Sequence, residues 1–176
     1  MFTRTFARIV GWEGSVPPDG VVRVPARLGG EPVAEIGDRA FSGLKPGFRD
    51  FFGDRRGAFA RALGAPYRLE LPDGVVRIGA HAFEGEIALQ SVRLPSTLRR
   101  LGPGAFANCP GLKEIEIPEG VSDIPDACFL GCFSLARVAP PASLRTVSPL
   151  AFAACERLRL NLPPSVAVDP DSGVVR

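Results

Sequence analysis

The chain has 176 residues, a net charge of +2 and a hydrophobic content of 45%. These values are typical of one ordinary domain with a real core, and so small a charge does not indicate a nucleic-acid-binding protein. The sequence contains no run of 18 apolar residues, so no membrane span is predicted. The start lacks the apolar stretch of a secretory signal, so we expect a cytoplasmic protein if the chain is complete, or a secreted or cell-surface protein if it is a fragment.

Residues 5–43 form an opening unit. Residues 6–10 and 21–25 have the pattern of short strands, and the Gly- and Pro-containing segment between them predicts turns. Residues 33–41 then match residues 75–83 position for position. Because the terminal repeats of an array are usually atypical, we interpret residues 5–43 as an N-terminal capping coil.

Residues 44–66 interrupt the array as an insert. Pro72 follows Phe41 by 31 residues, whereas Pro95 follows Phe83 by 12. A short helix is predicted near residues 55–63. We consider three roles for the insert: a lid over the first coils, a loop for recognition or self-association, and a membrane-surface contact. The candidate contact residues are its aromatic and basic side chains: Phe48, Arg49, Phe51, Phe52, Arg55, Arg56 and Phe59.

Residues 67–166 repeat with a period of 23, and residues 167–176 form a tail. The period is carried by columns of prolines, phenylalanines, leucines and cysteines, represented by Pro72, Pro95, Pro118 and Pro141, by Phe83, Phe106, Phe129 and Phe152, by Leu89, Leu112, Leu135 and Leu158, and by Cys109, Cys132 and Cys155. A fixed period of this length is typical of a solenoid, in which each coil buries its apolar face against its neighbours. We therefore predict a single domain spanning residues 1–176.

Each coil opens with an apolar-x-apolar-Pro pattern, which predicts a short strand that pairs in parallel with the next coil about 4.8 Å away. The other half supplies a second wall, and the phenylalanines form an aromatic stack. We expect a parallel sheet on one face and mostly loops and short turns on the other. Gly37, Gly79 and Gly102 share a position with Pro125 and Ser148, so glycine there saves space rather than permitting a positive φ. In the last coil a one-residue slip would bury two leucines, Leu160 and Leu162.

These coils resemble the BspA-type leucine-rich repeat. The resemblance is carried by the spacing of apolar, Pro, Phe and Cys residues in a coil such as residues 112–132, with its Leu112, Ile115, Ile117, Pro118, Val121, Ile124, Phe129 and Cys132. It covers residues 20–43 and 67–166, with departures at Glu86, at Pro125 and in the insert. The resemblance implies a right-handed, curved solenoid that binds proteins, often at bacterial or protist cell surfaces, and it implies no catalytic residues.

The cysteines and the single histidine are candidate chemical groups. We expect Cys109, Cys132 and Cys155 to be buried, reduced thiols, since stacked side chains point the same way and Cys128 adds too few ligands for a zinc site. Glu86 takes the place of a cysteine, and we expect it to swing outward while Ile87 fills the gap. His81 lies at a tolerant turn position, so we predict no enzyme, no metal and no cofactor.

The outward strand positions form two charged columns. The first contains Glu70, Arg93 and Glu116 with Ala139, and the second contains Arg68, Glu114 and Arg137 with Ser91. Alternating signs favour cross-strand ion pairs on a solvated face, but a solenoid also binds partners on its concave side. Arginines at 77, 99, 100 and 145 form a basic edge that acids interrupt, so we expect no nucleic acid partner.

We therefore predict a non-catalytic protein–protein interaction module that binds a protein partner through the concave sheet face, the 44–66 loop, or both. The alternative is a structural spacer within a larger, adhesin-like cell-surface protein.

Overall fold

The computed structural model describes residues 7–9, 17–42, 66–162 and 166–168, and these residues contain thirteen strands and no helix. The strands are β1 Ala7–Ile9, β2 Val21–Arg23, β3 Arg27–Leu28, β4 Glu31–Ile36, β5 Tyr67–Glu70, β6 Arg77–Ile78, β7 Leu89–Arg93, β8 Arg100–Leu101, β9 Glu114–Glu116, β10 Asp123–Ile124, β11 Arg137–Ala139, β12 Thr146–Val147 and β13 Ala167–Val168. The helix predicted near residues 55–63 lies outside the described residues.

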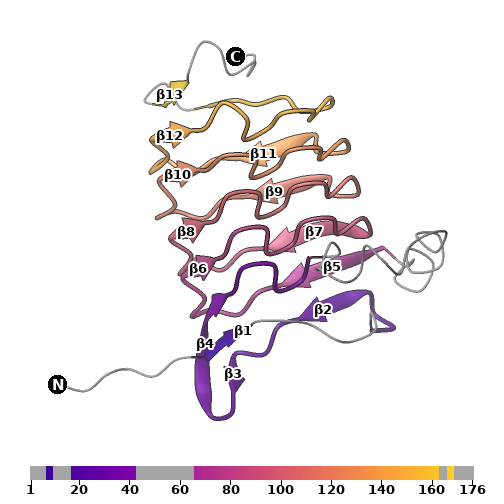
Figure 1. Cartoon of the computed structure of the whole chain (residues 1–176), viewed down its shortest axis with the longest axis vertical. Helices are drawn as coiled ribbons and strands as arrows, with labels where there is room; N and C mark the ends of the chain where they lie inside the picture. The colour runs from indigo at the N-terminus through magenta and orange to yellow at the C-terminus, as the bar shows by residue number, and fades with distance from the viewer. Residues whose placement is uncertain (1–6, 10–16, 43–65, 163–165, 169–176) are drawn as a thin grey trace.

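The longer strands of successive coils form one parallel sheet in the order β11-β9-β7-β5-β2 (Figure 1). Val92 pairs with Leu69 on one side and with Ile115 on the other, so residues 23 apart lie side by side. In β5, β9 and β11 the buried residues alternate with exposed or partly exposed ones, as in the exposed-buried-exposed pattern of β9. The predicted repeat solenoid with a parallel sheet on one face is confirmed.

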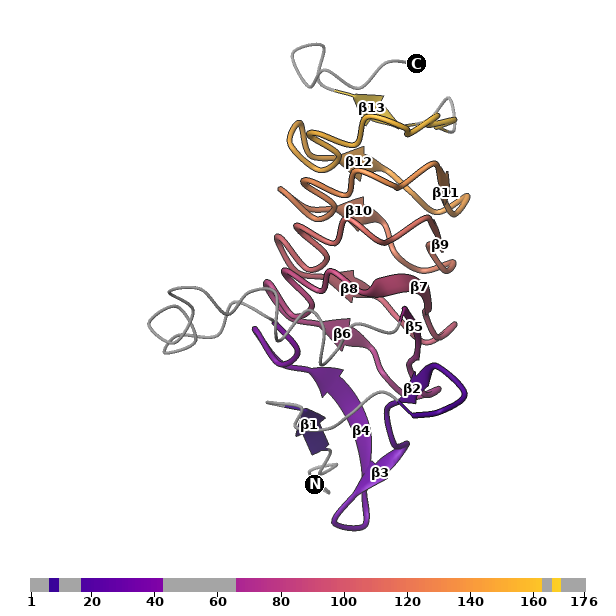
Figure 2. The same cartoon turned by 90° about the vertical axis from the view of Figure 1, so that its right-hand side faces the viewer.

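The opposite wall is also built from parallel ladders, although we expected mostly loops and short turns there. Its strands run in the orders β1-β4-β6-β8 and β10-β12-β13, and the hairpin strand β3 pairs antiparallel with β4 (Figure 2). Most of these strands are only two residues long, as in β6 and β8. Two residues are too few to show an alternating pattern, so the sequence did not reveal this second ladder.

The core is organised around a column of five phenylalanines, one from each coil. Successive ring centroids lie 4.9, 5.2, 5.6 and 5.3 Å apart, and the last three pairs are within 7° of parallel. The rings of Phe83, Phe106 and Phe129 have no exposed surface. The predicted aromatic stack is confirmed.

Backbone hydrogen bonds between coils fix the spacing of this column. The amide of Phe83 donates to the carbonyl of Ala105 at 2.8 Å, and the amide of Phe106 donates to that of Cys128 at 2.9 Å. The equivalent bonds recur at Phe41 and Phe129. Each ring is therefore placed over the next by its own backbone as well as by packing.

At the position shared by Gly37, Gly79 and Gly102, the structure confirms that glycine is needed to save space. A Cβ on Gly102 would lie 2.4 Å from the amide nitrogen of Ala80, and one on Gly79 would lie 2.6 Å from that of Asp38. Neither glycine has a positive φ. Glycine is required at these coils by the close approach of the neighbouring backbone.

The last coil is less regular than the others. Leu160 and Leu162 both pack against the core, but each remains partly exposed, as does Leu158. Residues 158–162 contain no strand, and the amide of Arg159 still donates to the carbonyl of Ala136 at 3.3 Å. The coil therefore covers the end of the core without extending the sheet of β11.

Replacing Phe106 with alanine tests the aromatic column. We expect Phe106→Ala to lower the free energy of unfolding by about 3–5 kcal/mol, because the cavity is closed on both sides by neighbouring coils. Phe133 is 49% exposed and is the matched control; Phe133→Ala should cost less than about 1 kcal/mol. Urea denaturation followed by circular dichroism measures both, and equal losses would contradict the column's role.

Adding one methyl group at Gly102 tests the coil spacing. We expect Gly102→Ala to destabilise the fold by about 1–3 kcal/mol, because the methyl group meets backbone atoms that cannot move aside cheaply. Ser148→Ala changes the same position in a coil that already carries a side chain, and it should cost no more than about 1 kcal/mol. A neutral Gly102→Ala variant in thermal unfolding would show that the coils have room to separate.

Candidate protein-interaction groove

The outward side chains of the longer strands form two rows across the sheet, as predicted. In one row Arg68, Ser91 and Glu114 lie on successive strands and Arg137 follows. In the other, Glu70 lies beside Arg93, and Glu116 lies beside Ala139. The residues of each row are brought together by strand pairing.

Sequence reasoning missed Arg23, which extends the second row. β2 pairs with β5 across the insert, so Arg23 lies opposite Glu70 although 47 positions separate them. The strand-like pattern of residues 21–25 predicted β2 itself. It did not predict its neighbour, because the insert breaks the 23-residue period at this point.

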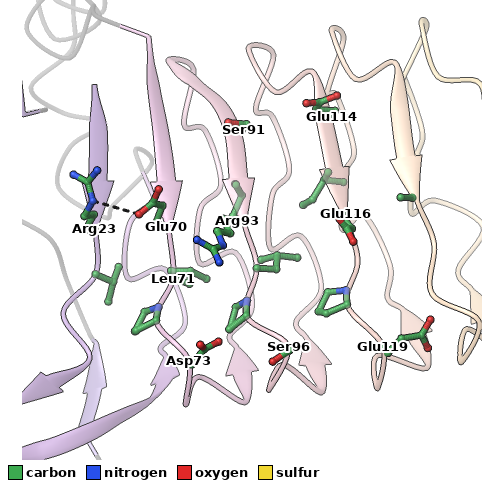
Figure 3. Close-up of a pocket in the computed structure, with 18 of the residues that line it drawn as sticks. Arg23, Glu70, Leu71, Asp73, Ser91, Arg93, Ser96, Glu114, Glu116 and Glu119 are labelled. Carbon is green, nitrogen blue, oxygen red and sulfur yellow. Dashed lines mark ion pairs between the residues drawn. The ribbon is translucent and has the colours of Figure 1, made fainter. Parts of the chain in front are cut away.

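An open groove of about 1100 Å³ runs across this sheet (Figure 3). It is lined by residues of β2, β5, β7, β9 and β11 and of the turns after them, including Arg23, Glu70, Asp73, Arg93, Glu114, Glu116, Glu119 and Arg137. Five of the predicted contact residues thus line it. Arg68 lies on the same sheet outside the groove lining, and the seven predicted contact residues of the insert lie outside the described residues.

Two ion pairs neutralise part of the groove. Arg23 Nε lies 3.3 Å from a carboxylate oxygen of Glu70, and Figure 3 shows the two side chains facing each other. Arg137 pairs with Glu114 on the adjacent strand. The Arg137–Glu114 pair forms as the alternating signs predicted, whereas Arg93 forms no ion pair with Glu70 or Glu116, and Arg23 was not part of the prediction. Both pairs are exposed and contribute only a fraction of a kcal/mol each.

The rim of the groove is held by Glu119. Its two carboxylate oxygens accept hydrogen bonds from the amides of Ala142 at 2.8 Å and Ser143 at 3.2 Å. These backbone hydrogen bonds, that of Ala142 foremost, lower the pKa of Glu119. Glu119 is therefore ionised at neutral pH, and among the described residues no basic group lies within 4.0 Å of its carboxylate, although the guanidinium of Arg99 lies beside the next residue, Gly120.

The basic edge predicted on the opposite wall is interrupted by acids. Arg77 lies beside Arg100 on the next strand, but its guanidinium is 2.7 Å from a carboxylate oxygen of Glu35. Asp123 follows on β10, where it is hydrogen-bonded to Ser122 and Thr146. The arginines therefore do not form a continuous positive strip.

Three cysteine thiols form a ladder, in which each thiol is hydrogen-bonded to the preceding coil. The thiols of Cys109, Cys132 and Cys155 each donate to the carbonyl of the phenylalanine one coil earlier, at 3.1 Å in every case. All four cysteines are free, and only Cys155 is partly exposed. Burial raises the pKa of Cys132 to about 12 and that of Cys155 to about 11. These thiols pack as small apolar groups, as predicted.

The expectation for Glu86 and Ile87 was wrong. Glu86 is half-buried, and one of its carboxylate oxygens accepts a hydrogen bond from the hydroxyl of buried Tyr67 at 2.8 Å. Ile87 points outward with 49% of its surface exposed. The carboxylate stays inside because it finds a donor there, so no apolar residue is needed to fill the position.

His81 lies at a turn away from the groove. Its φ is 54°, and the equivalent residues Arg39 and Ala127 have φ values of 54° and 52°, which confirms a tolerant, left-handed turn. Its Nδ1 atom lies 3.1 Å from one carboxylate oxygen of Glu84, but without hydrogen-bond geometry. Among the described residues, no group of three metal-ligating side chains gathers, and no helix has the length and apolarity to cross a membrane.

Comparison with protein families assigns the repeat. Residues 56–169 match the model of the BspA-type leucine-rich repeat region in six copies. The chain belongs to the BspA-type leucine-rich repeat family. Repeats of this family generally serve as protein-interaction or structural modules and are generally non-catalytic.

Solved structures of bacterial leucine-rich repeat proteins are similar to this BspA-type chain. A leucine-rich cell surface protein of Faecalibacterium prausnitzii is 32% identical with a TM-score of 0.61, over 80% of this chain and 31% of that one. Proteins from Bacteroides ovatus (23% identical, TM-score 0.52, 83% of this chain and 52% of that one) and Bacteroides capillosus (24%, 0.50, 81% and 85%) share the fold. The chain spans about a third of the Faecalibacterium protein. None of the curated proteins compared matches it.

The thiol ladder of this BspA-type chain predicts a loss of stability in alkali. The thiol of Cys132 ionises near pH 12 in the folded chain and near its ordinary pKa of 9.0 when unfolded. The contribution of the buried Cys132 thiol to the free energy of unfolding is complete below pH 9. It is lost as the pH rises toward 12, at up to about 1.4 kcal/mol per pH unit. Urea midpoints from pH 8 to 10.5 should therefore fall less steeply for Cys132→Ala than for the parent. If the urea midpoints of the parent and of Cys132→Ala fell equally with pH, the stabilising role of the buried thiol would be contradicted.

Proposed function

We propose that the groove across β2, β5, β7, β9 and β11 binds a protein partner, and that the chain itself has no catalytic role. The observation that carries the proposal is the groove of about 1100 Å³, hollowed in the face where two rows of polar side chains are displayed. None of the residues that line it is a histidine or a cysteine. The lining therefore suits recognition by ion pairs and shape.

The dimensions of the groove suit a segment of polypeptide. Five parallel strands about 4.8 Å apart span roughly 19 Å, which is the length of about six extended residues. The walls are rigid, because β5, β7 and β9 are paired on both sides and the residues beneath the sheet are buried. A rigid surface loses little entropy on binding, which favours affinity.

A second candidate function is that of a spacer in a cell-surface protein. The similar Faecalibacterium protein is a cell surface protein, and this chain corresponds to about a third of it. In that case a partner would bind elsewhere in a longer chain, and the repeats would set a distance. The seven aromatic and basic contact residues predicted in the 44–66 insert stay a prediction from the sequence.

Site-specific photo-crosslinking distinguishes these functions. We expect benzoylphenylalanine at Ser91, in the groove, to capture a discrete protein from the native cell or its surroundings, and Ser91→Trp to abolish the interaction. The matched control is the same probe at Leu150, which is 54% exposed and is not among the residues lining the groove. A probe at Phe52 tests the insert.

Mass spectrometry identifies the captured protein. Capture from Leu150 or Phe52 without capture from Ser91 would show that the groove is not the binding surface. No capture from any of the three positions would favour the spacer.

A further inference from the structure

The groove has a net charge opposite in sign to that of the chain. Its lining contains five carboxylates and three guanidiniums, a net charge of −2: Glu70, Asp73, Glu114, Glu116 and Glu119 against Arg23, Arg93 and Arg137. The chain as a whole has 21 basic and 19 acidic residues, a net charge of +2. The acidic character is therefore local to this face.

The ion pairs within the groove do not neutralise all of its carboxylates. Glu70 and Glu114 are each paired with an arginine. Among the described residues, neither Asp73 nor Glu116 has an ion-pair partner within 4.0 Å, and Glu119 is bound only by uncharged donors. Arg93 is the one guanidinium of the lining without an ion pair in the described part of the chain. Within the lining, three carboxylates and one guanidinium thus lack an ion pair.

A row of prolines follows the column of Glu70, Arg93 and Glu116 in the groove. Pro72, Pro95 and Pro118 line it at equivalent positions of three successive coils; Pro72 and Pro118 are partly exposed, and Pro95 is buried. In each coil the proline comes between a residue of that column and the turn residue Asp73, Ser96 or Glu119, and Figure 3 shows these turn residues below the column. Lysine and arginine side chains carry an apolar stem and a charged head, so they match an apolar strip edged with carboxylates.

We propose that the groove binds an extended, basic segment of a partner protein, whose Lys or Arg stems lie on Pro72 and Pro118 and whose charged heads pair with Asp73, Glu116 and Glu119. Asp73 and Glu119 are two coils apart, about 10 Å, which matches cationic residues three positions apart in an extended chain of polyproline II form, whose three residues per turn place both on one face. An acidic segment is repelled by the same carboxylates. This inference rests on the proposed function, since it names the partner chemistry of the same groove.

Selection of random twelve-residue peptides displayed on phage, against the full chain, tests the inference. Clones that bind the parent and not Ser91→Trp are groove-dependent. We expect these clones to carry a net positive charge, and their synthetic peptides to bind at least about tenfold more weakly to the double variant Asp73→Lys with Glu116→Lys. Glu156→Lys, an exposed carboxylate outside the groove lining, is the matched control and should leave binding unchanged.

The outcomes separate this inference from the proposed function. Groove-dependent clones that are neutral or acidic, or that bind the double variant as tightly as the parent, would overturn the basic-partner inference and leave the groove as a binding surface. A selection without any clone sensitive to Ser91→Trp would overturn both. Circular dichroism of each variant confirms that the fold is retained.

Discussion

The contact of each coil with an identical position in the next is the constraint on which this structure depends. Phenylalanine lies on phenylalanine at 4.9–5.6 Å, and the amide beside each ring donates to the neighbouring coil. Both interactions require one spacing between coils. This is why Gly102, which is in contact with the backbone of Gly79 and Ala80, leaves no room for a methyl group. Most variation between the coils therefore lies in the turns or on the outward faces.

The same spacing creates the groove. Strand pairing makes neighbours of residues that are 23 positions apart, so three consecutive coils place Glu70, Arg93 and Glu116 in one row. The coils share their buried residues and differ in these outward ones. The acidic excess of the groove therefore belongs to the set of coils as a whole, because no single coil carries it.

Variation inside the core is possible where a polar group finds a partner. Glu86 occupies the position at which other coils carry a thiol, and the hydroxyl of Tyr67 supplies its hydrogen bond. Tyr67 in turn pairs with Leu89 across a register shift, and the later coils carry buried leucines there, Leu112 and Leu135. The two departures from the repeat are thus one feature, a buried pair in the first regular coil.

The sequence alone determined the period, the strand positions, the phenylalanine column and the state of the thiols, because a buried, repeated contact needs the same residue in every coil. It also placed five residues of the groove. Only the tertiary structure showed the second parallel ladder, whose two-residue strands are too short to have a pattern, and the inward orientation of Glu86. The tertiary structure alone placed Arg23 beside Glu70, because strand pairing across the insert cannot be inferred from the 23-residue period. It alone showed that Asp73 and Glu119 line the groove, because the shape of the rim depends on contacts between coils.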